Sequence, residues 1–129
     1  MTHEKTFILA VGREAKIILH GKIQRNGKEI EVGFEFLIKD SHDQYFHSPI
    51  GINHPQYWKL KKSTPEKAQL LEMEYSGVSR KQLNEAIREF RHFIGPGFNL
   101  KYNVKIQDRI KTLKGIRLST GTRRMLAAV

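Results

Sequence analysis

The feature that most constrains the fold of this chain is an Asn-Gly pair at residues 26–27, flanked on both sides by alternating apolar and polar residues. Asn and Gly tolerate the positive φ angles of a two-residue hairpin turn, so the pair predicts two antiparallel strands. The turn would place Ile23 opposite Ile30 and Lys22 opposite Glu31. In this register one face of the hairpin is continuously apolar and consists of Ile17, Leu19, Ile23, Ile30, Val32, Phe34 and Phe36.

A further strand is predicted at residues 6–11, before the hairpin. Residues 12–14 would turn the chain back, so the N-terminal part is expected to form a three-stranded antiparallel meander with one buried and one solvated face. After the hairpin, residues 40–62 contain turn residues and show no regular periodicity. We expect a long irregular connection there, anchored to the domain by its aromatic and aliphatic side chains.

Two helices are predicted next, joined by a very short link. Residues 63–66 have the pattern of a capping box with proline in the first turn, and Gly77 is a natural stop. Ser79 and Gln82 form a second capping box, at the start of a helix that would end at residues 95–97. The apolar positions of this second helix recur at helical spacing and are Leu83, Ala86, Ile87, Phe90 and Ile94. The short link favours a helical hairpin packed on the apolar face of the meander.

The C-terminal part is expected to begin with a strand and to end in a basic tail. Residues 98–107 alternate between apolar side chains and Asn, Lys or Gln, which predicts a half-buried strand with a basic, amide-rich exposed face. Residues 108–118 have the composition of another short strand, and residues 119–129 that of a basic linker with an apolar end. The sequence therefore predicts a single α+β domain over residues 1–118, followed by a C-terminal tail at 119–129. Its parts are an N-terminal three-stranded antiparallel meander, a helical hairpin packed on it, and a C-terminal basic strand.

The positive charge of the chain is concentrated near its C-terminus. The formal net charge is +10. Residues 98–129 hold eight Lys or Arg against one Asp, a net +7 that leaves +3 for residues 1–97. Such a segment attracts polyanions, and phosphate contacts carry affinity without sequence information. We therefore predict a non-catalytic nucleic-acid-binding protein. Its phosphate-binding residues would be Lys101, Lys105, Arg109, Lys111, Lys114, Arg117, Arg123 and Arg124, with Trp58 as a base-stacking side chain beside three lysines.

A second hypothesis is a structural or assembly subunit whose basic tail docks on an acidic protein partner, for example in an oligomeric or virion-like assembly. The apolar residues 125–129 follow a flexible basic linker, as in a docking peptide. A homo-oligomer that forms through an exposed strand edge belongs to the same class.

A third hypothesis is a metal-dependent hydrolase or nuclease. Imidazole and carboxylate groups are ligands of zinc and other divalent ions, and several of them fall in the irregular stretch. These candidate ligands are Asp40, His42, Asp43, His47 and His54. Their spacing matches no compact metal motif, so this hypothesis requires the five side chains to converge in the fold.

Several classes are not indicated by the sequence. The chain has no cysteine, which excludes disulfides and thiolate metal sites. It has no phosphate-binding loop, dinucleotide fingerprint or nucleophile elbow, so neither a cofactor nor catalysis is expected. No signal peptide or long apolar span is visible, so a cytoplasmic location without membrane contact is expected.

Overall fold

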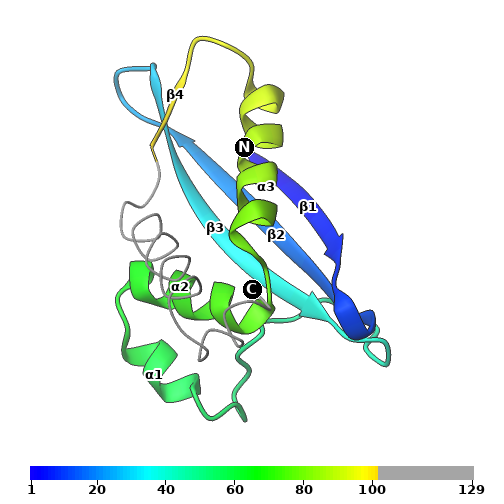
Figure 1. Cartoon of the computed structure of the whole chain (residues 1–129). Coiled ribbons are helices and arrows are strands. Elements are labelled where there is room, and N and C mark those ends of the chain that lie inside the picture. The colour runs from blue at the N-terminus through cyan, green and yellow to red at the C-terminus, as the bar shows by residue number, and fades with distance from the viewer. Residues whose placement is uncertain (102–129) are drawn as a thin grey trace, which may run out of the picture.

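The computed structural model describes residues 1–101, in which helices pack on a four-stranded β-sheet (Figure 1). In chain order the elements are β1 (Thr2–Ile8), a 3-10 turn (Ala10–Gly12), β2 (Glu14–Ile23), β3 (Glu29–Lys39), α1 (Tyr57–Lys62), α2 (Pro65–Ser76), α3 (Arg80–Ile94) and β4 (Asn99–Lys101). The strand order is β1-β2-β3-β4; the first three strands are antiparallel, and β4 runs parallel to β3. The predicted α+β class, with its antiparallel meander and a C-terminal strand that joins the sheet, is confirmed.

The hairpin of β2 and β3 has the predicted register. Ile23 pairs with Ile30 and Lys22 pairs with Glu31. One face of the hairpin is buried, as the alternation indicated, except that Ile23 is half-exposed near the turn. The buried side chains of this face are Ala15, Ile17, Leu19, Ile30, Val32, Phe34, Phe36 and Ile38. Burial of one face fixes the register, because a slip by one residue would expose this whole set.

The turn itself differs from the predicted two-residue loop. The Gly27 N–H donates to the Gln24 carbonyl at 3.0 Å, so the turn is centred one residue earlier than expected, and Gly27 follows it with a φ of 70°. The Asn26 side-chain oxygen accepts from the N–H groups of Lys28 at 2.9 Å and Glu29 at 3.2 Å. The loop is longer than two residues, but its midpoint still lies between Asn26 and Gly27. The pairing of β2 with β3 is therefore unchanged.

The first strand lies nearer the N-terminus than predicted, at Thr2–Ile8 instead of residues 6–11. The polar residues of this edge strand form ion pairs with α3. Lys5 Nζ lies 2.6 Å from Glu89 Oε2, and His3 Nε2 lies 3.5 Å from Glu89 Oε1. These pairs form between distant parts of the chain, whereas the prediction followed the apolar run alone.

Helix α3 begins and packs as predicted. Ser79 Oγ accepts from the Gln82 N–H at 3.1 Å, and Gln82 Oε1 accepts from the Ser79 N–H at 2.9 Å, which completes the capping box. Leu83, Ala86 and Phe90 are buried against the sheet. Figure 1 shows α3 lying along one face of the sheet over β1 and β2, while α2 packs against β3.

Helix α1 was not predicted, because it lies in the stretch expected to be irregular. Its presence also changes the start of α2. Ser63 ends α1, and its Oγ donates to the Lys59 carbonyl at 2.6 Å. The N-cap of α2 is Thr64, whose Oγ1 accepts from the Lys67 N–H at 3.4 Å, so the predicted capping box at residues 63–66 is wrong. The proline in the first turn and the stop at Gly77 are confirmed.

The predicted strand beyond Lys101, the strand at 108–118 and the tail at 119–129 lie outside the described residues, as does the predicted domain boundary.

One glycine of the sheet allows a close approach that can be tested. A Cβ at Gly21 would lie 2.9 Å from the Cζ of buried Phe90 and 3.0 Å from Ile30 Cγ2, whereas a Cβ at Gly33 would meet no atom within 4 Å. We expect Gly21→Ala to lower the free energy of unfolding by about 1–3 kcal/mol through overpacking. Gly33→Ala should leave it unchanged or raise it by up to about 1 kcal/mol. Urea denaturation of both variants measures the difference, and equal effects would contradict this packing.

Candidate nucleic-acid interface

Helix α1 presents an aromatic side chain to solvent. The helix follows a series of turns, in which the Tyr57 N–H donates to the His54 carbonyl at 3.0 Å, and it packs on α2. The Tyr57 ring meets the Trp58 ring edge to face, with centroids 5.2 Å apart. Trp58 is nevertheless 67% exposed. An indole of this size is highly buried in most proteins, so its exposure here is a candidate binding feature.

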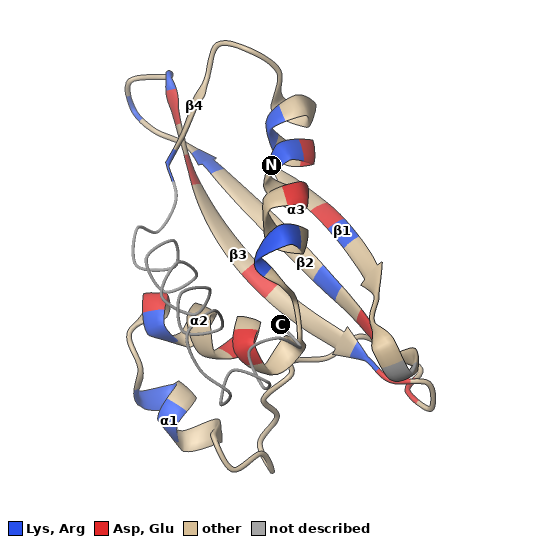
Figure 2. Ribbon diagram, in the orientation of Figure 1, with Lys and Arg blue, Asp and Glu red and all other residues tan. Residues whose placement is uncertain are grey.

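Three lysines follow Trp58 on the same helix. Lys59, Lys61 and Lys62 are all exposed, and none of them forms an ion pair within residues 1–101. Figure 2 shows that α1 carries basic but no acidic residues. Lys61 Nζ lies 5.4 Å from the centroid of the Tyr57 ring, which is cation–π geometry. Lysines at the end of a helix stabilise it through the helix dipole, and this role alone would account for their positions. The helix dipole does not explain why the indole of Trp58 on the same helix is exposed.

Lys101 lies in β4, away from α1. It pairs with Glu31 of β3 and lines a hollow of about 470 Å³ together with His20, Lys22 and Gln69. The charges around this hollow are mixed, since Glu31 also lies there. Figure 1 shows α2 between β4 and α1, so the structure does not bring Lys101 and Trp58 together. The other predicted phosphate-binding residues lie outside the described part of the chain and are Lys105, Arg109, Lys111, Lys114, Arg117, Arg123 and Arg124.

The loop after β3 brings together part of the predicted metal site. Asp43 Oδ2 accepts from the Asp40 N–H at 2.9 Å and from His47 Nε2 at 3.0 Å. His42 Nε2 lies 3.7 Å from Asp43 Oδ1, and Asp40 forms an ion pair with Arg13 at 2.8 Å. Each carboxylate thus has a partner within the protein, and these contacts close the loop between Asp40 and His47.

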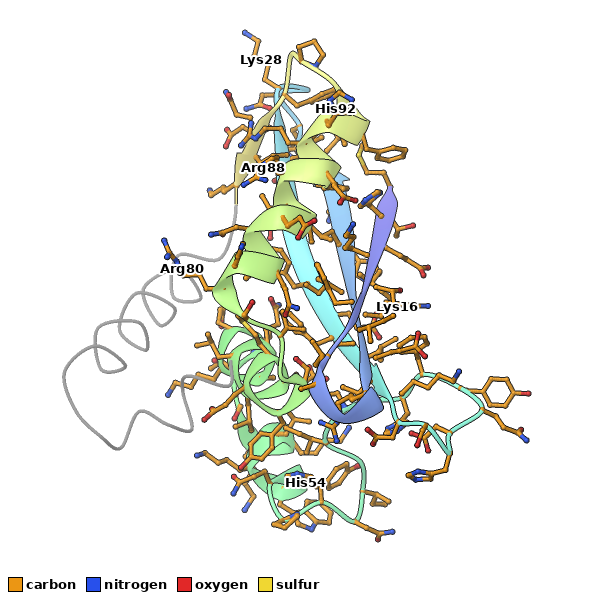
Figure 3. The ribbon with its side chains drawn as sticks, turned by 45° about the vertical axis from the view of Figure 1, so that its right-hand side comes forward. Lys16, Lys28, His54, Arg80, Arg88 and His92 are labelled. Carbon is orange, nitrogen blue, oxygen red and sulfur yellow. The ribbon has the colours of Figure 1, made fainter. Side chains whose placement is uncertain are left out.

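His54 does not join this loop. Its Nδ1 accepts from the Gln56 N–H at 3.0 Å, and its ring meets the Tyr75 ring edge to face at 4.7 Å. Figure 3 shows His54 beside the helices at the α1 end of the molecule. Within residues 1–101, no group of three or more His, Asp or Glu side chains is placed to hold a metal ion. The convergence that the third hypothesis requires is therefore not seen in this part of the chain.

The pairing of His47 predicts a pH-dependent contribution to stability. Its Nδ1–H donates to the Ser48 carbonyl at 2.8 Å, and this bond and the Asp43 carboxylate raise the pKa of His47 above 6.5. The Asp40 N–H and His47 lower the pKa of Asp43 below 3.8. A raised histidine pKa stabilises the fold at pH values below 6.5 and loses that effect as the pH rises through the folded-state value. The lowered Asp43 pKa stabilises it above 3.8 and loses that effect as the pH falls.

We therefore expect His47→Gln to lower the free energy of unfolding at about pH 5.5 and to have almost no effect at about pH 9. The difference should stay below about 1 kcal/mol, because both side chains are partly exposed. The control is His42→Gln, which removes an imidazole that is 82% exposed and lies farther from Asp43, at 3.7 Å, so its effect on the free energy of unfolding should be smaller. Urea denaturation at the two pH values measures both variants, and an equal effect of His47→Gln at both would contradict the assignment.

Comparison with known proteins adds no relative. No family model matches the chain, and no curated protein or solved structure matches it either. No helix in residues 1–101 is long and apolar enough to cross a membrane.

Proposed function

We propose that this protein is a non-catalytic nucleic-acid-binding protein. The observation that carries the proposal is the exposed indole of Trp58 on a helix whose three lysines are also exposed and have no acidic partner within residues 1–101. Aromatic side chains stack on bases, and ammonium groups neutralise phosphates; together these are the two elements of a sequence-tolerant site for a single strand.

The charge of the chain supports the same proposal. The net charge is +10, and most of it is in the C-terminal segment that begins in β4. In this proposal Lys101 and the basic residues that follow it contact further phosphates, so that binding should depend steeply on salt. The base contacts come from α1, and α2 supports that helix.

The edge of β1 favours a second candidate, an assembly subunit. β1 is the outer strand of the sheet, and Ile8 at its end is 82% exposed. An exposed edge can pair with a second copy or with another protein, and the basic C-terminal segment would then dock on an acidic partner surface. Sedimentation velocity without nucleic acid tests self-assembly through this edge, because a subunit that pairs with its own copies should form larger species as its concentration rises and a protein that binds nucleic acid as a monomer should not.

Substitution of Trp58 tests the stacking contact. In fluorescence-anisotropy titrations with single-stranded RNA and DNA, we expect Trp58→Ala to weaken binding by about 1–3 kcal/mol, the usual value of one stacked base. Trp58→Phe should retain much of the affinity, because a phenyl ring still stacks. The matched control is Tyr45→Ala, which removes an aromatic ring that is 77% exposed on another loop. Equal affinities of the Trp58→Ala and Tyr45→Ala proteins would remove α1 from the site.

The lysines of α1 are tested by salt dependence. We expect the double variant Lys59→Ala/Lys62→Ala to bind more weakly and to reduce the slope of log affinity against log salt by about 1.4, since each phosphate contact on a single strand contributes about 0.7. The control, Lys28→Ala/Arg88→Ala, loses the same charge from exposed positions far from α1 (Figure 3). Similar slopes for the two double variants would show that only net charge matters. An absence of binding by the unmodified protein at low salt would refute the proposed function.

A further inference from the structure

A groove lies beside Trp58, between α1, α2 and the loop that precedes them. Its volume is about 620 Å³, within the range of roughly 300–1,000 Å³ typical of small-molecule sites. Its walls are mainly apolar and aromatic, and two charged residues line it. The residues that matter for its chemistry are Ile50, Ile52, Tyr57, Leu60, Lys61 and Glu72.

Glu72 is an unusual residue for such a groove. Its Oε2 accepts one hydrogen bond, from Ser48 Oγ at 3.4 Å, and its Oε1 has no hydrogen-bond donor within residues 1–101. No Lys, Arg or His of the described chain forms an ion pair with it. Burial is the main cause of a raised pKa of the Glu72 carboxyl. A half-buried carboxylate without a cation partner is unfavourable for folding, and such groups are concentrated at functional sites.

The surroundings of the groove limit what can bind to Glu72. Lys61 lines the groove, and Lys59 and Lys62 lie on the same helix. The positive charge of Lys61 and of the helix that carries it disfavours amines and other cations, although a carboxylate alone would attract them, and it favours polyanions. A ligand that carries negative charge outside the groove and presents neutral N–H donors inside it therefore fits best. A nucleotide has both features, since its phosphate is charged and its base carries neutral donors.

The four bases differ in the donors that they offer to one carboxylate. Guanine has N1–H and the N2 amine side by side, so both can donate to the two oxygens of a single carboxylate. Uracil has one ring N–H between two carbonyls, whereas adenine and cytosine present one amine next to an acceptor nitrogen. The carboxylate of Glu72 therefore matches the Watson–Crick edge of guanine best. That edge is occupied in a duplex and is open only in a single strand.

We propose that the groove between α1, α2 and residues 48–52 binds a guanine base of single-stranded nucleic acid, with Glu72 accepting from its N1–H and N2 amine. Tyr57 forms an aromatic wall for the base, and Lys61 at the rim contacts the adjoining phosphate. The exposed indole of Trp58 on the same helix stacks on a neighbouring base. This inference rests on the proposed function and adds a base preference to it.

The test uses the full chain and RNA oligonucleotides of about 12 nucleotides at low salt. One probe is oligouridine, and the others carry a single central guanosine, inosine or adenosine. We expect guanosine to bind about tenfold more tightly than uridine or adenosine at that position, the usual size of a bidentate base contact. Inosine lacks the N2 amine and should lose most of this gain. Equal binding of guanosine and inosine would overturn the bidentate contact to Glu72.

The Glu72→Gln variant assigns the preference to the groove. The glutamine amide offers only one acceptor oxygen, so guanosine should lose its advantage, while oligouridine should bind as tightly as before or somewhat more tightly because one negative charge is removed. Glu74→Gln, on the same helix but outside the groove, is the matched control and should keep the preference. Thermal melts show whether the variants are folded, and the inosine comparison in the unmodified protein decides the question without any variant.

The outcomes separate this inference from the proposed function. If every oligonucleotide binds equally well, the guanine site is refuted and nucleic-acid binding stands. If no oligonucleotide binds at low salt, the proposed function fails, and the guanine site fails with it. A guanosine preference that survives in Glu72→Gln would overturn the role of this groove.

Discussion

The structure depends on the burial of one face of the β2–β3 hairpin under α2 and α3. Phe36 of the sheet and Phe90 of the helix are both fully buried, and the side chains of Ile17, Leu19 and Ile30 lie in the same core. Because strand side chains alternate, this packing decides which residues of the three strands face the helices and which face solvent. The Lys5–Glu89 ion pair then sets β1 against the same helix.

The region that carries the candidate site is a consequence of that packing. Since α3 covers β1 and β2, α2 is left to pack along β3, where β4 pairs only with the first residues of the strand. The chain between β3 and α2 must cross this end of the molecule, and α1 forms within it, held mainly by α2. A short helix with one supporting partner has a large free surface, and this accounts for the exposure of Trp58 and for the groove beside it.

The sequence was most informative where local chemistry determines structure. The register of the β2–β3 hairpin, the Ser79–Gln82 capping box and the apolar stripe of α3 each depend on neighbours in the chain, and each was predicted correctly, although the turn at Asn26 is longer than predicted. The strand at Thr2–Ile8 and α1 were misplaced or missed, because ion pairs and packing between distant segments determine them. The lysines next to Trp58 in the sequence made it a candidate site residue. No local sequence pattern indicated Glu72, because its burial depends on Ser48 and on the approach of α1.

In the proposed function, affinity and selectivity would come from different residues. Lysines on α1 and in the basic C-terminal segment attract any polyanion and cannot distinguish one base from another. The carboxylate of Glu72 works against that attraction, since a negative charge near a phosphate backbone weakens binding. Such a carboxylate is favourable only where a ligand donates hydrogen bonds to it. Solubility would explain the three exposed lysines of α1, but it would not explain a carboxylate of this kind beside them. A positive surface with one half-buried acceptor is what the proposed function requires, because the lysines would hold a single strand loosely and the carboxylate would select one base within it.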